Sequence, residues 1–182
     1  MAYSENINNH KLAKNIPNLN KNPLLYIFED IKLKNKENTI WLEFGVQTGS
    51  TINKISKFTK KKVYGFDTFT GLPEDWRKGF LKGSLTNNGV LPEVGNNVVL
   101  IKGLFQETLI NFLEENCINK KISFVHMDAD LYSSTKYVLD HIEKYLDNEC
   151  YFVFDELINV PGLHYDNSEI RALDEFLNEN KK

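Results

Sequence analysis

The chain has 182 residues, a formal net charge of −3 and a sequence pI near 5.8. This length fits one domain with a single hydrophobic core, and the charge argues against binding to nucleic acids or to anionic membranes, which requires clustered positive charge. The sequence contains no apolar run long enough to span a bilayer and no signal-peptide core at its polar N-terminus. We therefore expect a cytoplasmic protein whose two isolated cysteines are reduced.

The first predicted element is a helix that begins after a polar stretch. Residues 1–22 show no apolar period, so we expect a flexible N-terminal arm, followed by a single domain over 23–182. Asn22 and Pro23 have the form of a helix start, a capping residue followed by proline. The apolar residues that follow recur at helical spacing: Leu24, Ile27, Phe28 and Ile31. This helix is expected to cover one edge of a sheet.

A glycine turn follows the first predicted strand, which ends near Glu43. Gly45 and Gly49 allow a ligand to approach the backbone closely, and the next helix, from Ser50 onward, would point unpaired N–H groups at that ligand. A dinucleotide fingerprint, G-x-G-x-x-G, would need glycine where Gln47 and Ser50 stand. The turn is therefore typical of nucleotide binding, but not of a pyrophosphate site.

A second strand is predicted at 63–67, after a helix with apolar residues at Ile52, Ile55 and Phe58. Strand, helix and strand form a βαβ unit, whose strands are parallel and whose right-handed crossover brings both strand ends to one edge. Asp67 then lies where open α/β folds place an acid that accepts hydrogen bonds from the two hydroxyls of a ribose. The alternative is an aspartate that only stabilises a turn.

The residues 68–97 are rich in glycine and proline and show no sustained period, so a long loop is predicted. The loop leaves from the ligand-binding edge and carries the aromatic residues Phe69, Trp76 and Phe80 together with Arg77. We interpret it as a lid over a cofactor or substrate. In the alternative interpretation, the aromatic side chains only attach an irregular excursion to the surface.

Three further strands are predicted at 98–101, 122–127 and 151–154, as apolar runs typical of parallel strands covered on both faces. Phe105, after the first of them, is placed either to lie against an adenine ring or to join the core. The helical stripes that accompany these strands are Leu109, Phe112, Leu113 and Asn116; then Val138, Ile142, Tyr145 and Leu146; and, from near Ser168, Ile170, Leu173 and Leu177.

Acidic residues follow two of these strands. Asp128 and Asp130 come directly after 122–127, and Asp155 and Glu156 come directly after 151–154. Adjacent parallel strands lie close together, so these carboxylates can converge, and their mutual repulsion would be relieved by a bound divalent cation. Oxygen ligands of this kind suit Mg²⁺, Mn²⁺ or Ca²⁺.

The alternative is that Asp128 and Asp130 cap a helix and that Asp155 and Glu156 form a polar turn. Four acids at two strand ends exceed what capping requires, which favours the metal site. His126 alternates with Asp128 along the strand, so it either points toward the same site or is a buried, hydrogen-bonded structural histidine.

Two patterns in the sequence resemble known families. The spacing E-x-G-x-x-x-G from Glu43 to Gly49 resembles the first motif of class I S-adenosylmethionine-dependent methyltransferases. Most of the chain from Thr39 onward then resembles the macrocin O-methyltransferase (TylF-type) family, whose characterised members methylate sugar hydroxyls with S-adenosylmethionine and Mg²⁺. The blocks that carry this second resemblance are 41–50, 65–76, 101–108, 126–135 and 154–156.

The resemblance implies an α/β fold, a Rossmann-like class I methyltransferase three-layer sandwich with a parallel sheet in the order 3-2-1-4-5. The resemblance itself implies an active O-methyltransferase. The last two strands of that fold are missing from the sequence, and this favours the alternative, a catalytically impaired module that binds a cofactor or a partner. The acceptor would be a small molecule or a glycan. An exposed fifth strand would favour a homo-oligomer that contacts through this strand and the C-terminal helix.

The site residues that we predict fall into three sets. The metal ligands implied by the resemblance are Asp128, Asp155 and Glu156, the last being a departure from the aspartate of macrolide-sugar members. Asp130, or Asp128 itself, would collect the proton from the acceptor hydroxyl. The residues predicted to contact S-adenosylmethionine are Glu43, Gly45, Gly49, Ser50, Asp67, Thr68 and Phe105.

Overall fold

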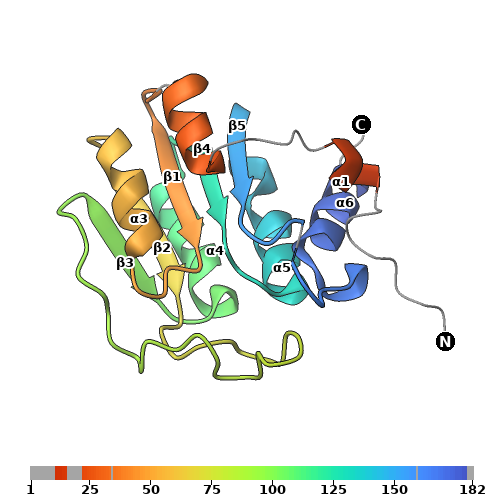
Figure 1. Cartoon of the computed structure of the whole chain (residues 1–182). Helices are drawn as coiled ribbons and strands as arrows, with labels where there is room; N and C mark the ends of the chain where they lie inside the picture. Colours follow the sequence, from red (N-terminus) through yellow and green to blue (C-terminus); the bar gives the residue numbers. More distant parts are fainter. Residues whose placement is uncertain (1–10, 16–21, 34, 159, 180–182) are drawn as a thin grey trace.

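The computed structural model describes residues 11–15, 22–33, 35–158 and 160–179. A single sheet of five parallel strands, in the order β3-β2-β1-β4-β5, confirms the predicted fold class (Figure 1). The strands are β1 (Thr39–Phe44), β2 (Val63–Asp67), β3 (Val98–Lys102), β4 (Lys121–Met127) and β5 (Leu146–Phe154). Every residue of the central strand β1 is buried, as expected for a parallel strand covered on both faces.

Helices cover both faces of the sheet and form a three-layer sandwich (Figure 1). On one face, α4 (Phe105–Asn116) and α5 (Tyr132–Ile142) pack against the sheet, and α6 (Glu169–Glu179) packs against α5. The other face is covered by α3 (Ser50–Ile55) and by the predicted first helix, which consists of α2 and a π-helical turn. The shorter elements are α2 (Pro23–Leu25), the π-helix Tyr26–Asp30, and the 3₁₀ turns Ser56–Phe58, Glu143–Tyr145 and Tyr165–Asn167.

The predicted start of the first helix is confirmed. The side chain of Asn22 accepts a hydrogen bond from the N–H of Leu24 at 2.9 Å, and Pro23 occupies the first helical position. Part of the predicted N-terminal arm is ordered, because α1 (Lys11–Asn15) lies against α6 and Lys11 Nζ is 3.2 Å from a carboxylate oxygen of Asp174. Residues 1–10 and 16–21 of the arm lie outside the described residues.

The fifth strand begins earlier than predicted. The sequence analysis assigned Tyr145 and Leu146 to the preceding helix. That helix continues past Ile142 as the 3₁₀ turn that ends at Tyr145, whereas Leu146 is the first residue of β5. Leu146 pairs with Ile122 of β4, and the pairing then shifts so that Tyr151 is opposite Phe124. The polar residues in between form an irregularity in the strand, and this hides the strand signal in the sequence.

The ends of the five strands are joined by one row of backbone hydrogen bonds. Within this row the N–H of Gly45 donates to Phe66 at 2.9 Å, and the N–H of Asp128 donates to Phe44 at 2.8 Å. The other two bonds run from Gly103 to Asp67 at 3.0 Å and from Asp155 to Met127 at 3.0 Å. The row fixes the strand ends in register, so the segments that leave them all start at the same edge.

None of the described helices has the length and apolar character needed to cross a membrane. In the described part of the chain, β5 is an edge strand with β4 as its partner. The homo-oligomer expected from this edge stays a prediction, which light scattering would check.

Gly45→Ala is expected to destabilise the fold more than Gly79→Ala. Both glycines have a φ of +91°, which costs an alanine about 1–2 kcal/mol. A Cβ on Gly45 would lie 1.8 Å from the carbonyl oxygen of Asp128, whereas one on Gly79 would meet nothing within 4 Å. We expect overpacking to lower the free energy of unfolding of Gly45→Ala by a further 1–3 kcal/mol or so, measured by urea denaturation. Equal losses in the two variants would contradict the close approach.

Candidate active site

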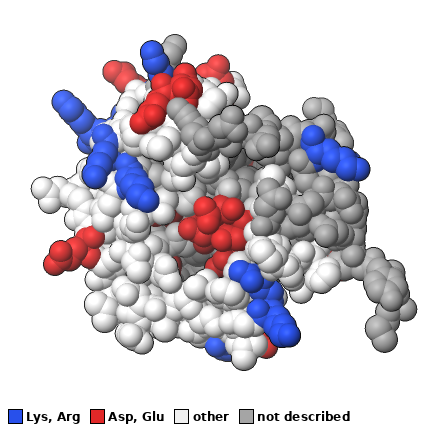
Figure 2. Space-filling view, in the orientation of Figure 1, with Lys and Arg blue, Asp and Glu red and all other residues white. Residues whose placement is uncertain are grey.

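A pocket of about 320 Å³ lies at the edge of the sheet where the strands end. Figure 2 shows acidic side chains gathered in a hollow at the centre of the face that Figure 1 presents. The pocket is formed by the β1–α3 turn, the end of β2, the long loop, the β3–α4 turn, the β4–α5 turn and the end of β5. Its lining residues include Gly45, Val46, Gln47, Ser50, Asp67, Thr68, Gly71, Leu72, Leu85, Leu104, Phe105, Asp128, Asp130, Ser134, Asp155 and Glu156.

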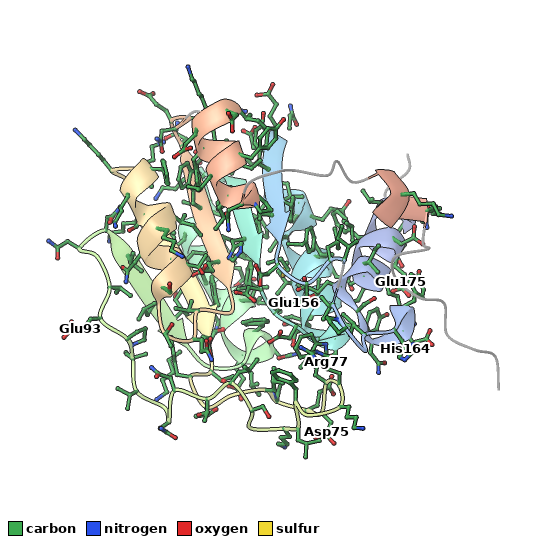
Figure 3. All side chains as sticks on the ribbon, viewed as in Figure 1. Asp75, Arg77, Glu93, Glu156, His164 and Glu175 are labelled. Atoms are coloured by element: carbon green, nitrogen blue, oxygen red, sulfur yellow. The ribbon has the colours of Figure 1, made fainter. Side chains whose placement is uncertain are left out.

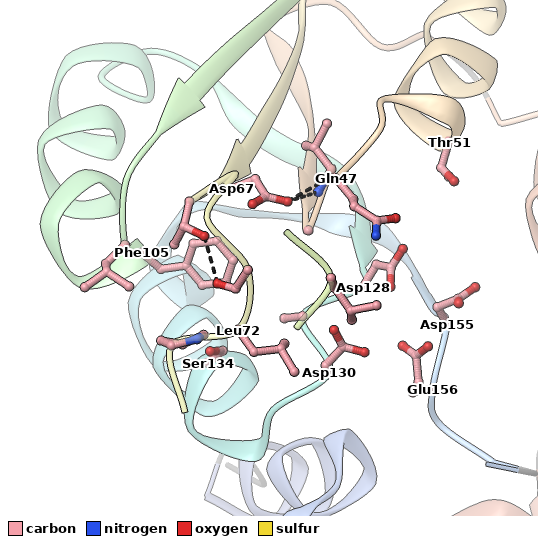
Figure 4. A pocket seen from close by; sticks show the side chains of 18 of the residues that line it. Gln47, Thr51, Asp67, Leu72, Phe105, Asp128, Asp130, Ser134, Asp155 and Glu156 are labelled. Atoms are coloured by element: carbon pink, nitrogen blue, oxygen red, sulfur yellow. Dashed lines mark hydrogen bonds between the residues drawn. The ribbon is translucent and has the colours of Figure 1, made fainter. Parts of the chain in front are cut away.

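Asp67 holds the glycine turn in place. Its Oδ2 accepts hydrogen bonds from the N–H groups of Val46 at 2.8 Å and Gln47 at 2.7 Å (Figure 4). Its Oδ1 accepts one from the N–H of Phe69 at 2.6 Å. Gln47, whose N–H is one of these donors, has a left-handed conformation with a φ of +46°. These three bonds are the turn-stabilising role that the sequence analysis gave as the alternative for Asp67, while its contact with a ribose stays a prediction.

Of the residues predicted to contact the cofactor, Gly45, Ser50, Asp67, Thr68 and Phe105 line the pocket. Phe105 also packs edge-on against Phe44, with ring centroids 5.3 Å apart, so it belongs both to the pocket and to the margin of the core. The core interpretation of Phe105 is therefore confirmed in part, and its contact with an adenine ring stays a prediction.

Gly49 and Glu43 are not among the residues that line the pocket. Gly49 closes the turn by donating its N–H to the carbonyl of Val46 at 2.8 Å, with a φ of +78°. Glu43 is fully buried, and its Oε1 lies 2.8 Å from Nδ1 of His126, the residue opposite it on β4. A direct contact between Glu43 and a cofactor stays a prediction, and His126 is the buried, hydrogen-bonded histidine of the second interpretation.

Three carboxylates converge on the opposite side of the pocket from Asp67 (Figure 4). One oxygen each from Asp128, Asp130 and Glu156 lies within 4.8 Å of the others. Asp155, which was predicted as a metal ligand, lines the same pocket but is exposed and lies outside this group. Asp130, predicted as a proton acceptor, belongs to the group in its place and has a left-handed conformation with a φ of +63°.

The group of Asp128, Asp130 and Glu156 has the electrostatics of a cation site. Burial, followed by the charge of Asp155, raises the pKa of Asp130 to about 7, and burial and neighbouring carboxylates also raise the pKa of Asp128 and of Glu156. Oε2 of Glu156 is buried and has no hydrogen-bond partner in the part of the chain that the structure describes. A divalent cation would both neutralise the repulsion and satisfy this oxygen, so the residues present fit such an ion.

The long loop covers part of the pocket, as the lid interpretation requires. Leu72 and Leu85 contribute to its lining. The N–H of Leu72 donates to the carbonyl of Ser84 at 2.9 Å, and the carbonyl of Leu72 accepts from the N–H of Gly83 at 2.9 Å. The loop therefore has a folded structure of its own, although it contains no helix or regular strand. Closure of this loop over a cofactor or substrate stays a prediction.

Arg77 is the cation of this loop that affects the acidic group. Its guanidinium lies 4.4 Å from the ring centre of Trp76 and 4.1 Å from that of Phe80, and its Nη1 donates to the carbonyl of Pro161 at 3.5 Å. Figure 3 labels Arg77 below Glu156. The charge of Arg77 opposes the rise in the pKa of Asp130, so the loop and the acidic group are coupled electrostatically.

The sequence analysis missed one acid next to this site. Glu169, the first residue of α6, is fully buried, and its Oε1 lies 3.3 Å from the N–H of Ala129, between Asp128 and Asp130. The local sequence identifies Glu169 only as an acid in the first turn of a helix, a position that needs no further explanation. Knowledge of how α6 packs on α5 is required to place it here.

Three solved structures of known proteins resemble this fold. "Crystal Structure of CalS11, Calicheamicin Methyltransferase" has a TM-score of 0.62 and 22% identity, with 94% of this chain and 72% of that chain covered. "Apo structure of CalS11, TDP-rhamnose 3'-o-methyltransferase, an enzyme in Calicheamicin biosynthesis" has a TM-score of 0.57 and 24% identity over 91% and 71% of the two chains. "Structure of the O-methyltransferase NovP" has a TM-score of 0.62 and 19% identity over 86% and 69%. At these identities the likeness shows a shared fold.

A family model described as "Methyltransferase domain" matches residues 42–157, which is more than half of the chain. The match begins in β1 and ends just after Glu156, so it includes the glycine turn, Asp67 and the acidic group. No curated protein sequence matches the chain significantly.

Proposed function

Because the chain belongs to the methyltransferase-domain family, we propose that it transfers the methyl group of S-adenosylmethionine to a hydroxyl of a sugar or of a glycosylated small molecule. The observation that carries this proposal is a single pocket with two chemically different sides. The β1–α3 turn and Asp67 form one side, and the carboxylates of Asp128, Asp130 and Glu156 form the other (Figure 4). One side suits a nucleoside cofactor, and the other suits activation of an acceptor.

The cofactor side depends on Asp67. A carboxylate has about four lone-pair positions, and among the described residues Oδ2 uses two of them and Oδ1 uses one. Oδ1 therefore keeps one position for a ribose hydroxyl of the cofactor. Phe105 and Leu104 offer apolar surface nearby for an adenine ring. The three backbone bonds orient Asp67 before a ligand arrives, which lowers the entropic cost of binding.

The acceptor side depends on the acidic group. Asp128 and Glu156 would hold a divalent cation, with Asp130 as the third ligand in this conformation and Asp155 at the exposed end of the pocket. When bound, such a cation would lower the pKa of an acceptor hydroxyl and orient it. The proton of that hydroxyl needs an acceptor, and a carboxylate oxygen of Asp130 or of Asp128 would collect it.

The class of acceptor is suggested by two lines of support. The blocks 41–50, 65–76 and 126–135 resemble the macrocin O-methyltransferase family. A structural neighbour with the same fold is described as a TDP-rhamnose 3'-O-methyltransferase. The loop 68–97 would close over the acceptor, with Leu72 and Leu85 on its inner side.

The wild-type protein is expected to bind S-adenosylmethionine in titration calorimetry, and Asp67→Asn is expected to bind it roughly tenfold to hundredfold more weakly. The loss corresponds to one hydrogen bond to a charged group. Asp75→Asn is the matched control, because Asp75 also accepts from a backbone N–H, that of Lys82 at 2.8 Å, but is outside the pocket lining. Thermal unfolding of each variant separates lost binding from lost folding. A folded wild-type protein that gives no heat would contradict the proposal.

Methyl transfer to a sugar-bearing acceptor is expected to fall at least about a hundredfold on chelation with EDTA and to recover with Mg²⁺, because the metal contribution amounts to several kcal/mol. The assay follows label from methyl-labelled cofactor. Asp128→Asn should be inactive at every Mg²⁺ concentration, while Asp140→Asn, an exposed residue of α5 paired with Lys136, should behave as the wild type.

Activity that survives EDTA would remove the metal from the proposal. Cofactor binding without transfer to any acceptor would favour the alternative, a catalytically impaired module that binds the cofactor or a partner.

A further inference from the structure

Glu169 is a fully buried carboxylate that the matched family region does not contain. It is the first residue of α6, whereas the family match ends at residue 157. A fully buried carboxylate is costly, since an apolar side chain of similar volume would pack there without losing hydration. The contacts of Glu169 therefore require an explanation beyond the packing of α6.

One oxygen of Glu169 accepts hydrogen bonds both from the turn formed by Asp128, Ala129 and Asp130, here called the acidic turn, and from α5. Oε1 accepts a hydrogen bond from the backbone N–H of Ala129 at 3.3 Å and another from Oγ1 of Thr135 at 3.0 Å. Ala129 stands between Asp128 and Asp130, and Thr135 is a buried residue of α5. The carboxylate thus links the backbone of the turn to the helix that follows it.

The turn that receives this bond is under strain. Asp130 has a φ of +63°, a conformation that a residue with a Cβ rarely adopts, and the N–H of Leu131 reaches back to the carbonyl of Ala129 at 2.6 Å. The carboxylates of Asp128 and Asp130 also repel each other across this turn. Such a conformation persists only when neighbouring groups hold it, and the N–H of Ala129 is the group that Glu169 holds.

The packing of α6 on α5 leaves the hydrogen-bonding capacity of the second oxygen of Glu169 unsatisfied. Oε2 is buried and has no hydrogen-bond partner among the described residues. Burial, and then the charge of Asp128, raise the pKa of Glu169 to about 8, although the bond from Thr135 opposes the rise. A group kept in this costly environment next to the acidic turn supports a role in the site.

We propose that Glu169 is a positioning residue, which fixes the Asp128–Asp130 turn through the N–H of Ala129 so that both carboxylates lie beside Glu156. The inference rests on the proposed function, because it assigns the convergence of these carboxylates to cation binding. It also extends the site to α6, outside the matched domain. Groups that orient a metal ligand in this way typically change metal affinity by about ten- to hundredfold when they are replaced.

The competing explanation is that Glu169 only attaches α6 to α5. Glu175, on the same helix, does make an attachment of this kind. Its Oε2 accepts a hydrogen bond from Oη of Tyr132 at 2.7 Å, and its Oε1 accepts one from Nε of Arg171 at 2.9 Å. The guanidinium of Arg171 in turn lies 4.1 Å from the ring centre of Tyr132. Among the described residues, Glu175 makes no hydrogen bond or ion pair with the acidic turn, so it is the matched control.

The test compares the wild type with Glu169→Leu, Glu169→Gln and Glu175→Leu. Leucine keeps the volume and removes the acceptor, whereas glutamine keeps a carbonyl oxygen for the N–H of Ala129. Mn²⁺ affinity is measured by electron paramagnetic resonance, backbone hydrogen exchange of the segment 126–131 by mass spectrometry, and folding by thermal unfolding. We expect Glu169→Leu to bind Mn²⁺ about ten- to hundredfold more weakly and to exchange faster in this segment. Glu169→Gln and Glu175→Leu should resemble the wild type in both.

Unchanged Mn²⁺ affinity and unchanged exchange in a folded Glu169→Leu would overturn the inference, as would equal effects in Glu175→Leu. If Glu169→Leu does not fold, Glu169→Ala, which also removes the acceptor for the N–H of Ala129, replaces it in the comparison, with the same expected and contradicting results. A wild-type protein that binds no Mn²⁺ would refute the metal part of the proposed function instead. In that case, exchange of the segment 126–131 that is faster in Glu169→Leu but not in Glu175→Leu would still support positioning of the turn by Glu169. Unchanged exchange in Glu169→Leu would refute that positioning.

Discussion

Four backbone hydrogen bonds join the ends of the five strands at the edge of the sheet, and the positions of the site residues depend on this row. The bond between Asp128 and Phe44 requires the two backbones to approach so closely that only glycine fits at position 45. The bond between Asp155 and Met127 brings the end of β5 to the same edge. Loops that carry chemistry need a rigid support of this kind, and here the sheet supplies it through its backbone.

Much of the fold could be predicted from the sequence because alternating strands and helices specify parallel strands and a common ligand edge. The acids at positions 67, 128 and 156 were found because they directly follow apolar strands. The contacts of Glu43 could not be predicted, because they depend on which residue of β4 lies opposite it, and the pairing of β1 with β4 shifts between Ile40 and Trp41.

Other details of the site involve backbone conformations that have no sequence signal. Gln47, which donates to Asp67, and Asp130, which belongs to the acidic group, both have positive φ values. Glu169 was missed for another reason, since its partner Ala129 is distant in the chain. Contacts between an element and a distant turn depend on tertiary packing, which periodicity does not encode.

The irregular start of β5 has a consequence for how another chain could attach to the sheet. Its first half carries Asp147 and Glu149, which form ion pairs with Lys36 at 2.6 and 2.9 Å, and its pairing with β4 is interrupted there. Charged, irregular edges resist the addition of a further strand. Only the second half, which ends at Phe154, offers a regular backbone template, and it leads directly to Asp155 and Glu156. A strand added from outside would therefore border the acceptor side of the pocket, so that assembly and substrate access would share one surface.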